Sequence, residues 1–141
     1  MQFDRKLYSA RVESLSAANE FVEGCAERFG LDAQKKFGLL LVLEEAFVNI
    51  CHYAYPDGTG DAEIACTGDG ADFTLEITDS GAPFDILSLP EPDTSAPIME
   101  RQIGGLGIHF IRTLSDSVSY RRENDRNILR MVFRRIPSVN P

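Results

Sequence analysis

Residues 45–55 read Glu-Ala-Phe-Val-Asn-Ile-Cys-His-Tyr-Ala-Tyr and lie within a longer apolar run. Glu45 and Asn49 are four residues apart, a spacing that places both side chains on one face of an α-helix. A carboxylate beside a carboxamide makes a poor core layer, but both groups offer oxygen atoms to a metal-bound phosphate. Two interpretations are open: a polar stripe where a buried helix reaches solvent, or one end of a nucleotide site.

The helix that carries this pair is expected to be long and central. Asp32 is a typical N-cap, and the sequence Pro56-Asp57-Gly58 predicts that the helix ends near Ala54. Apolar residues occupy much of its circumference, which indicates burial on several sides. These residues are Phe37, Leu40, Leu41, Leu43, Ala46, Phe47 and Ile50.

The remaining periodicity predicts a mostly antiparallel sheet and two further helices. Helical spacing follows Ser14 or Ser16 as far as Gly30, and a third helix is expected from Gly105 or Gly107 to about residue 115. Alternating apolar residues predict strands at 6–12, 62–66, 73–77, 118–122 and 128–135. The fold class is therefore α+β: one domain over residues 1–141, a two-layer α/β sandwich with the sheet packed on three helices.

Composition limits the classes of function. The chain has 141 residues, of which 43% are hydrophobic and 26% charged, and a net charge of −8. The negative charge argues against a nucleic acid as the main ligand. No apolar run approaches the roughly 18 residues of a membrane span, so we expect no membrane association and a cytoplasmic protein. Three cysteines, widely spaced in the sequence, are interpreted as reduced core thiols: Cys25, Cys51 and Cys66.

The charge is distributed unevenly. Residues 120–141 contain six arginines but only two acidic residues, whereas the rest of the chain is strongly acidic. One interpretation is an exposed terminal hairpin whose arginines offset the acidic body of the domain. The other is a docking surface for an acidic protein partner.

A second candidate site residue lies at the end of a predicted strand. Asp79 continues the inward-facing pattern of residues 73–77, so its carboxylate points toward the apolar layer. An isolated buried charge costs several kcal/mol, roughly, and needs a partner. Asp79 either closes an Asx turn at the strand exit or accepts a hydrogen bond from an amino group in a pocket, such as that of adenine. Gly81 would let a flat ring pass close to the backbone.

The third feature is the glycine-rich sequence Gly104-Gly105-Leu106-Gly107, just before the third predicted helix. Glycines let the chain approach a ligand closely, and a helix N-terminus offers free N–H groups to a phosphate. The sequence is neither a P-loop nor a dinucleotide fingerprint.

The order of these three features resembles the GHKL family of ATP-binding domains. Glu45–Asn49 matches the N box of that family, residues 79–84 (Asp-Ser-Gly-Ala-Pro-Phe) the first glycine box, and residues 104–107 the second. The Glu-Ala-x-x-Asn and Gly-Gly-Leu-Gly-Ile sequences are most similar to the anti-sigma-factor serine/threonine kinase branch, the RsbW type. The similarity covers essentially the whole chain and implies the Bergerat ATP-binding fold.

The resemblance implies a role for each motif. Asn49 would bind Mg²⁺, and Asp79 would bind the adenine of ATP. The glycine-box residues would bind the phosphates and form part of the lid, which is expected over residues 85–103. Glu45 would be the general base that takes the proton of a serine or threonine hydroxyl. The cofactor-binding residues on this basis are Asn49, Asp79, Gly81, Gly104, Gly105, Leu106 and Gly107.

The resemblance also implies partners. It predicts a protein kinase and anti-sigma factor that phosphorylates a STAS-type anti-anti-sigma antagonist, binds a sigma factor and forms a homodimer. Two alternatives stay open: a non-catalytic switch module that binds ATP, and an interaction domain that keeps only the fold.

Overall fold

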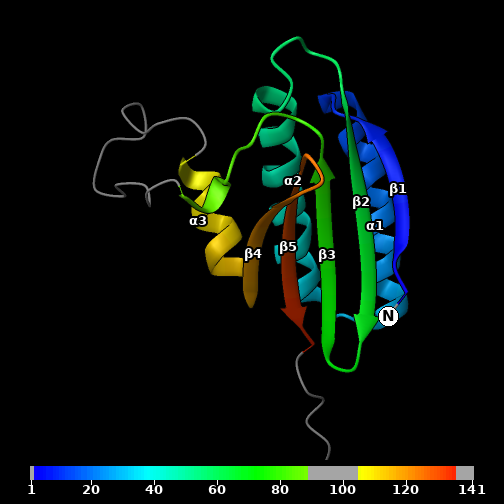
Figure 1. Ribbon diagram of the computed structural model, residues 1–141. Coiled ribbons are helices and arrows are strands. Elements are labelled where there is room, and N and C mark those ends of the chain that lie inside the picture. The colour runs from blue at the N-terminus through cyan, green and yellow to red at the C-terminus, as the bar shows by residue number, and fades with distance from the viewer. Residues whose placement is uncertain (1, 89–104, 136–141) are drawn as a thin grey trace, which may run out of the picture.

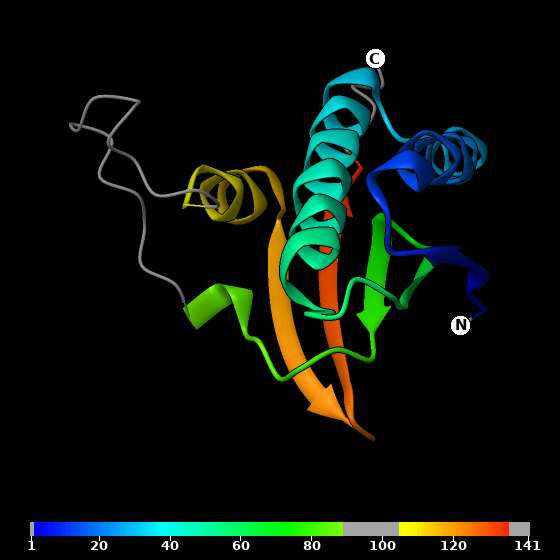
Figure 2. The same ribbon diagram turned by 90° about the horizontal axis from the view of Figure 1, so that it is seen from above.

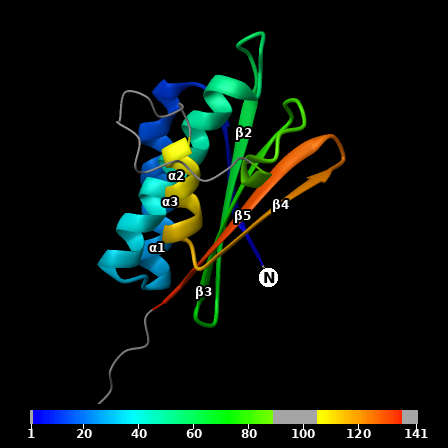
Figure 3. The same ribbon diagram turned by 90° about the vertical axis from the view of Figure 1, so that its left-hand side faces the viewer.

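The computed structural model describes residues 2–88 and 105–135. A five-stranded antiparallel sheet has the order β1-β2-β3-β5-β4, and the three described α-helices pack on one of its faces (Figures 1, 2 and 3). The strands are β1 (Asp4–Ser9), β2 (Asp61–Asp69), β3 (Asp72–Asp79), β4 (Ser117–Glu123) and β5 (Arg126–Arg134). The helices are α1 (Leu15–Phe29), α2 (Ala33–Tyr53) and α3 (Gly105–Leu114). The expected two-layer α+β architecture is confirmed.

Helix α2 is the central helix, packed between α1 and α3 (Figure 2). The Asp32 carboxylate accepts a hydrogen bond from the Lys35 backbone N–H at 3.1 Å, which confirms the predicted N-cap. One expectation was wrong: Phe37 is 72% exposed. It lies seven residues before the exposed Glu44, on the side of α2 that faces solvent, because the other sides pack on the sheet and the neighbouring helices.

The strand register brings the candidate site residues to one end of the sheet. Asp79 is opposite Ala62 on β2 and opposite Asn127 on β5. Alternate residues of these strands face the helices and fill the core. The predicted inward positions of β2 and β3 are all buried, as expected: Ala62, Ile64, Cys66, Phe73, Leu75 and Ile77.

The chain reversals follow local sequence. Gly30 ends α1 in the left-handed conformation, with φ of 86°. The turn between β4 and β5 has φ of 53° at Asn124 and 60° at Asp125, the pair of positive values that a two-residue hairpin turn requires. Strand β1 was expected at 6–12 but spans Asp4–Ser9, since Val12–Ser14 turn into a short 3₁₀ helix that leads into α1. Within the described ranges, no helix has the length and hydropathy needed to cross a membrane.

Candidate functional site

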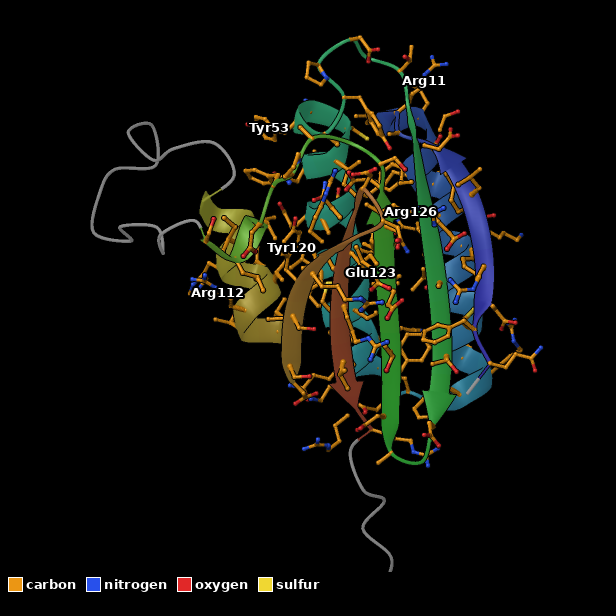
Figure 4. All side chains as sticks on the ribbon, viewed as in Figure 1. Arg11, Tyr53, Arg112, Tyr120, Glu123 and Arg126 are labelled. Atoms are coloured by element: carbon orange, nitrogen blue, oxygen red, sulfur yellow. The ribbon has the colours of Figure 1, made fainter. Side chains whose placement is uncertain are left out.

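A cavity lies between α2 and the ends of β3, β4 and β5. Asn49 of α2 and Asp79 of β3 both line it, beside Tyr120 of β4 and Asn127 of β5. Figure 4 labels Tyr120 on β4. The rest of its wall is apolar, with the side chains of Ala46, Ile50, Ile77 and Leu129 among others. A mainly apolar cavity with a few convergent polar groups is typical of a small-molecule site. The fold thus brings together two of the predicted site residues that are 30 positions apart in the chain.

Asp79 is buried, with 7% of its surface exposed, and its carboxylate has two partners within the described part of the chain. Oδ1 accepts hydrogen bonds from the Gly81 backbone N–H and from Nδ2 of Asn127, both at 2.9 Å. The bond from Gly81 is the Asx turn, which confirms the first interpretation of Asp79, while its role as an acceptor for adenine stays a prediction. Since Oδ1 takes both bonds that come from the described residues, Oδ2 keeps its lone pairs for a donor in the cavity.

Asn127 is the site residue that sequence reasoning missed. Its Nδ2 donates to Asp79 Oδ1 and to the Ala82 carbonyl, both at 2.9 Å. Its Oδ1 accepts from the Phe84 backbone N–H at 3.2 Å and from the Tyr120 hydroxyl at 2.5 Å. The Asn127 side chain therefore links three segments by hydrogen bonds: the end of β3, the loop that follows it, and β4. Strand parity contains the signal, because Asn127 is the polar member of the inward-facing set of β5.

Gly81 is required by a close approach of the backbone. A Cβ atom at this position would lie 2.2 Å from the Ala54 carbonyl oxygen at the C-terminal end of α2. The Gly81 carbonyl accepts a hydrogen bond from Nη1 of Arg122 at 2.9 Å. The absence of a side chain at Gly81 thus lets the loop pack directly against α2. This steric reason for a glycine differs from the expected one, which was to let a flat ligand ring pass close to the backbone.

Glu45 lies one turn before Asn49 and faces the start of α3. A Cβ atom on Gly107 would be 2.6 Å from Glu45 Oε2, so this glycine makes room for the carboxylate. Burial, and then the charge of Glu44, raise the pKa of Glu45 above its ordinary value. Gly105 and Leu106 form the first turn of α3, as the second glycine box predicts, while Gly104 and residues 89–103 of the predicted lid lie outside the described residues.

The arginine-rich hairpin pairs with acids of the domain itself. Arg130 donates from Nε to the buried Glu76 at 2.6 Å, and Arg121 lies 3.7 Å from the same carboxylate. Arg134 contacts Asp72 at 3.3 Å. These contacts support the first interpretation of the hairpin, in which its arginines offset the acidic body of the domain; the docking surface stays a prediction.

Asn127→Ala is expected to lower the free energy of unfolding by about 2–3 kcal/mol. The change removes one of the two hydrogen bonds to the buried Asp79 carboxylate, where the bond from Gly81 remains, and also removes the bond to the Ala82 carbonyl. Each bond left unmade in a buried site costs about 1–3 kcal/mol. Urea denaturation measures the effect. The control is Arg126→Ala, at the exposed neighbouring position, which is expected to stay within about 0.5 kcal/mol of the wild type. Equal midpoints for Asn127→Ala and Arg126→Ala would contradict this assignment.

Comparisons with known proteins agree with the geometry. Residues 8–133 match the histidine kinase-like ATPase domain family. Serine-protein kinase RsbW from Halalkalibacterium halodurans is 28% identical over 119 residues, 82% of this chain and 73% of the relative. Serine/threonine-protein kinase BtrW from Bordetella bronchiseptica is 27% identical over 118 residues, 83% of each chain.

A solved structure supports the fold. The structure of the RsbU and RsbW domains of a Mycobacterium tuberculosis protein superimposes with a TM-score of 0.66 at 12% identity. The match covers 96% of this chain and 32% of the solved chain, so this chain spans about a third of the solved chain. Because the family match spans nearly the whole sequence, the chain belongs to the histidine kinase-like ATPase domain family.

Proposed function

We propose that this protein is an ATP-dependent serine/threonine protein kinase and anti-sigma factor that phosphorylates a STAS-type antagonist in a partner-switching circuit. The observation that carries the proposal is the buried Asp79 carboxylate: Asn127 and Gly81 hold it through Oδ1, and Oδ2 accepts no hydrogen bond from residues 2–88 or 105–135. Similarity to two proteins named as serine or serine/threonine kinases supports the class of reaction.

The residues of the cavity fit ATP and Mg²⁺ by their chemistry. A carboxylate in an apolar wall suits the exocyclic amine of adenine, because that amine donates and the carboxylate accepts. Asn49 offers a carboxamide oxygen, a ligand type that Mg²⁺ accepts. The first turn of α3, at Gly105–Gly107, supplies backbone N–H groups for phosphate oxygens. When bound, MgATP supplies the phosphoryl group that is transferred.

Glu45 is proposed as the general base. It is four residues from Asn49 on α2, about 5–6 Å between Cβ atoms, so a base there lies near the metal-binding end of the site. Partial burial raises its pKa, which makes its carboxylate a stronger proton acceptor than an exposed glutamate. In this role Glu45 would accept the proton of the substrate hydroxyl and orient the hydroxyl oxygen toward the phosphoryl group.

The partners are part of the proposal. The family resemblance supports a STAS-domain anti-anti-sigma protein as substrate, a sigma factor as the sequestered partner, a homodimer and a cytoplasmic location. Nucleic acid and membrane are not proposed as ligands, because the net charge is −8 and the described helices are too short or too polar to span a membrane.

Calorimetry with MgATP tests the nucleotide part of the proposal. Saturable binding is expected, with a rise in melting temperature that follows from mass action; at a ligand concentration of about 100 times Kd the gain is about 2.7 kcal/mol. Absence of both heat and thermal shift would favour the third interpretation, an interaction domain that keeps only the fold.

Gly107→Ala is expected to slow phosphotransfer by about tenfold while the affinity for MgATP changes little. The new methyl group would occupy the space of the Glu45 carboxylate, 2.6 Å from Oε2, and displace the proposed base. Transfer rates at saturating ATP measure the effect. Gly24→Ala is the control, since Gly24 lies in α1 and its added methyl meets only an ordinary 3.4 Å contact with Arg28. An unchanged rate in Gly107→Ala would contradict the proposed position of Glu45.

A further inference from the structure

A second cavity lies on the side of the domain formed by β1, α1 and β2. Its wall contains the side chains of Cys25 and Cys66, although these residues are 41 positions apart. The sequence predicted reduced core thiols, and the packing of α1 on β2 also places these two in one cavity. Both are free and buried, with exposed fractions of 6% for Cys25 and 1% for Cys66. Two neighbouring thiols can form a disulfide, which a single thiol cannot.

Charged groups at the rim of the cavity distinguish the two thiols. Nη2 of Arg28 donates to Cys25 Sγ at 3.3 Å, and Asp4 Oδ2 lies 4.0 Å from the same sulfur. A hydrogen bond from the Cys66 thiol, with help from the charge of Arg28, lowers the pKa of Cys25 to about 7, although burial and Asp4 oppose this shift. The hydrogen bond with Cys25, together with burial, raises the pKa of Cys66. Cys25 is therefore the thiolate of the pair and Cys66 the thiol.

The cavity gives a small oxidant access to Cys25. Its volume is about 230 Å³, and it lies beside Arg28 and Asp4, whose side chains are 67% and 65% exposed. A peroxide is small enough to enter, and Arg28 can donate a hydrogen bond to the oxygen that leaves. Cys51 has a different environment: it lies on α2, and burial raises its pKa.

We propose that Cys25 and Cys66 form a peroxide-sensitive thiol pair that closes a reversible disulfide between α1 and β2. The Cys25 thiolate attacks one peroxide oxygen, the O–O bond breaks, and the departing oxygen takes a proton to form water. The resulting sulfenic acid is attacked by the sulfur of Cys66; the S–O bond breaks, and the proton of Cys66 leaves with the hydroxide as a second water. Two thiols are oxidised to one disulfide, and one hydrogen peroxide is reduced to two waters.

This site is separate from the proposed nucleotide site. Cys66 is opposite Leu75 on β3, and Leu75 is four residues before Asp79, about 14 Å at the usual rise along a strand. The disulfide is therefore expected to form equally with and without MgATP. A disulfide that does not form would contradict the thiol proposal alone, and a lack of kinase activity would contradict the kinase proposal alone.

The experiment treats the reduced full chain with hydrogen peroxide, alkylates the remaining thiols and maps the peptides by mass spectrometry. The expected product links the peptides of Cys25 and Cys66, leaves Cys51 alkylated and reverts with dithiothreitol. The initial rate is expected to rise with pH through about 7, as Cys25 becomes a thiolate. Cys51→Ala is expected to behave as the wild type.

Single variants separate the two roles. Cys66→Ala removes the hydrogen bond that favours the Cys25 thiolate, so it is assayed at a pH of about 9, above the ordinary pKa of a cysteine. There it is expected to accumulate Cys25 sulfenic acid, trapped by dimedone at about ten times the wild-type level, because no second thiol resolves it. Cys25→Ser is expected to lose both the disulfide and the early trapping, and circular dichroism of each variant checks the fold. The proposal would be overturned by oxidation of Cys51 at the same peroxide dose as Cys25, or by wild-type protein in which Cys25 and Cys66 both remain alkylated.

Discussion

Asp79→Asn is expected to lower the affinity for MgATP by about a hundredfold. The replacement keeps the shape of the side chain, and its oxygen can still accept the bonds from Gly81 and Asn127. The amide nitrogen of the new side chain then takes the place of Oδ2. Two hydrogen-bond donors, this nitrogen and the amine of the adenine, would face each other. Loss of a charge-assisted hydrogen bond costs about 1.5–3 kcal/mol, which corresponds to this loss of affinity.

A matched control is present on the same strand. Glu76 is also a buried acid of β3, but it lies three residues earlier, on the face of the sheet that points away from the helices. Glu76→Gln makes the same carboxylate-to-amide change, and its effect is expected on the ion pairs with Arg121 and Arg130 alone. Calorimetry compares the two variants. If a folded Asp79→Asn protein bound MgATP with wild-type affinity, the assignment of Asp79 to adenine would be contradicted.

Glu45→Gln is expected to reduce phosphotransfer by about 10²–10⁴-fold while the affinity for MgATP stays close to that of the wild type. The amide keeps the size of the side chain and its contact with Gly107 but cannot accept the proton of a hydroxyl. A protonated Glu45 also cannot accept the proton of the hydroxyl. Because burial raises the pKa of Glu45, the rate is expected to fall on acidification at a higher pH than for an exposed glutamate.

Glu44→Gln provides the control for this change. Glu44 is exposed and adjacent, and its charge contributes to the raised pKa of Glu45. Its removal is expected to preserve the maximal rate and to move the acidic limb of the pH profile to lower pH. Full transfer by Glu45→Gln, or an equal loss in Glu44→Gln, would show that Glu45 is not the base.

Features set by neighbouring residues were predictable from the sequence. The N-cap at Asp32 and the end of α1 at Gly30 depend on a few adjacent residues, and both are confirmed. The turn at Asn124 and Asp125 is set in the same local way. The inward position of Asp79 follows from strand parity in the same way. Local patterns thus indicated two residues, Asn49 and Asp79, that line one cavity, while their roles stay predictions.

Features set by tertiary packing were not predictable. Asn127 meets Asp79 only through the register of β3 and β5, which one sequence does not display. Cys25 and Cys66 share a cavity because α1 crosses β2, and Phe37 is exposed because neither the sheet nor another helix covers its side of α2. In each case the deciding contact joins segments that are distant in the chain.

The central claim is that this chain transfers phosphate from ATP to a protein hydroxyl. It is tested most directly by incubation of the wild-type protein and Glu45→Gln with γ-labelled ATP, Mg²⁺ and a candidate STAS-domain antagonist. The account predicts label on a serine or threonine of the antagonist with the wild type, and almost none with Glu45→Gln although both bind ATP. Tight MgATP binding by the wild type without transfer to an antagonist that it binds would contradict the claim and favour the non-catalytic switch module.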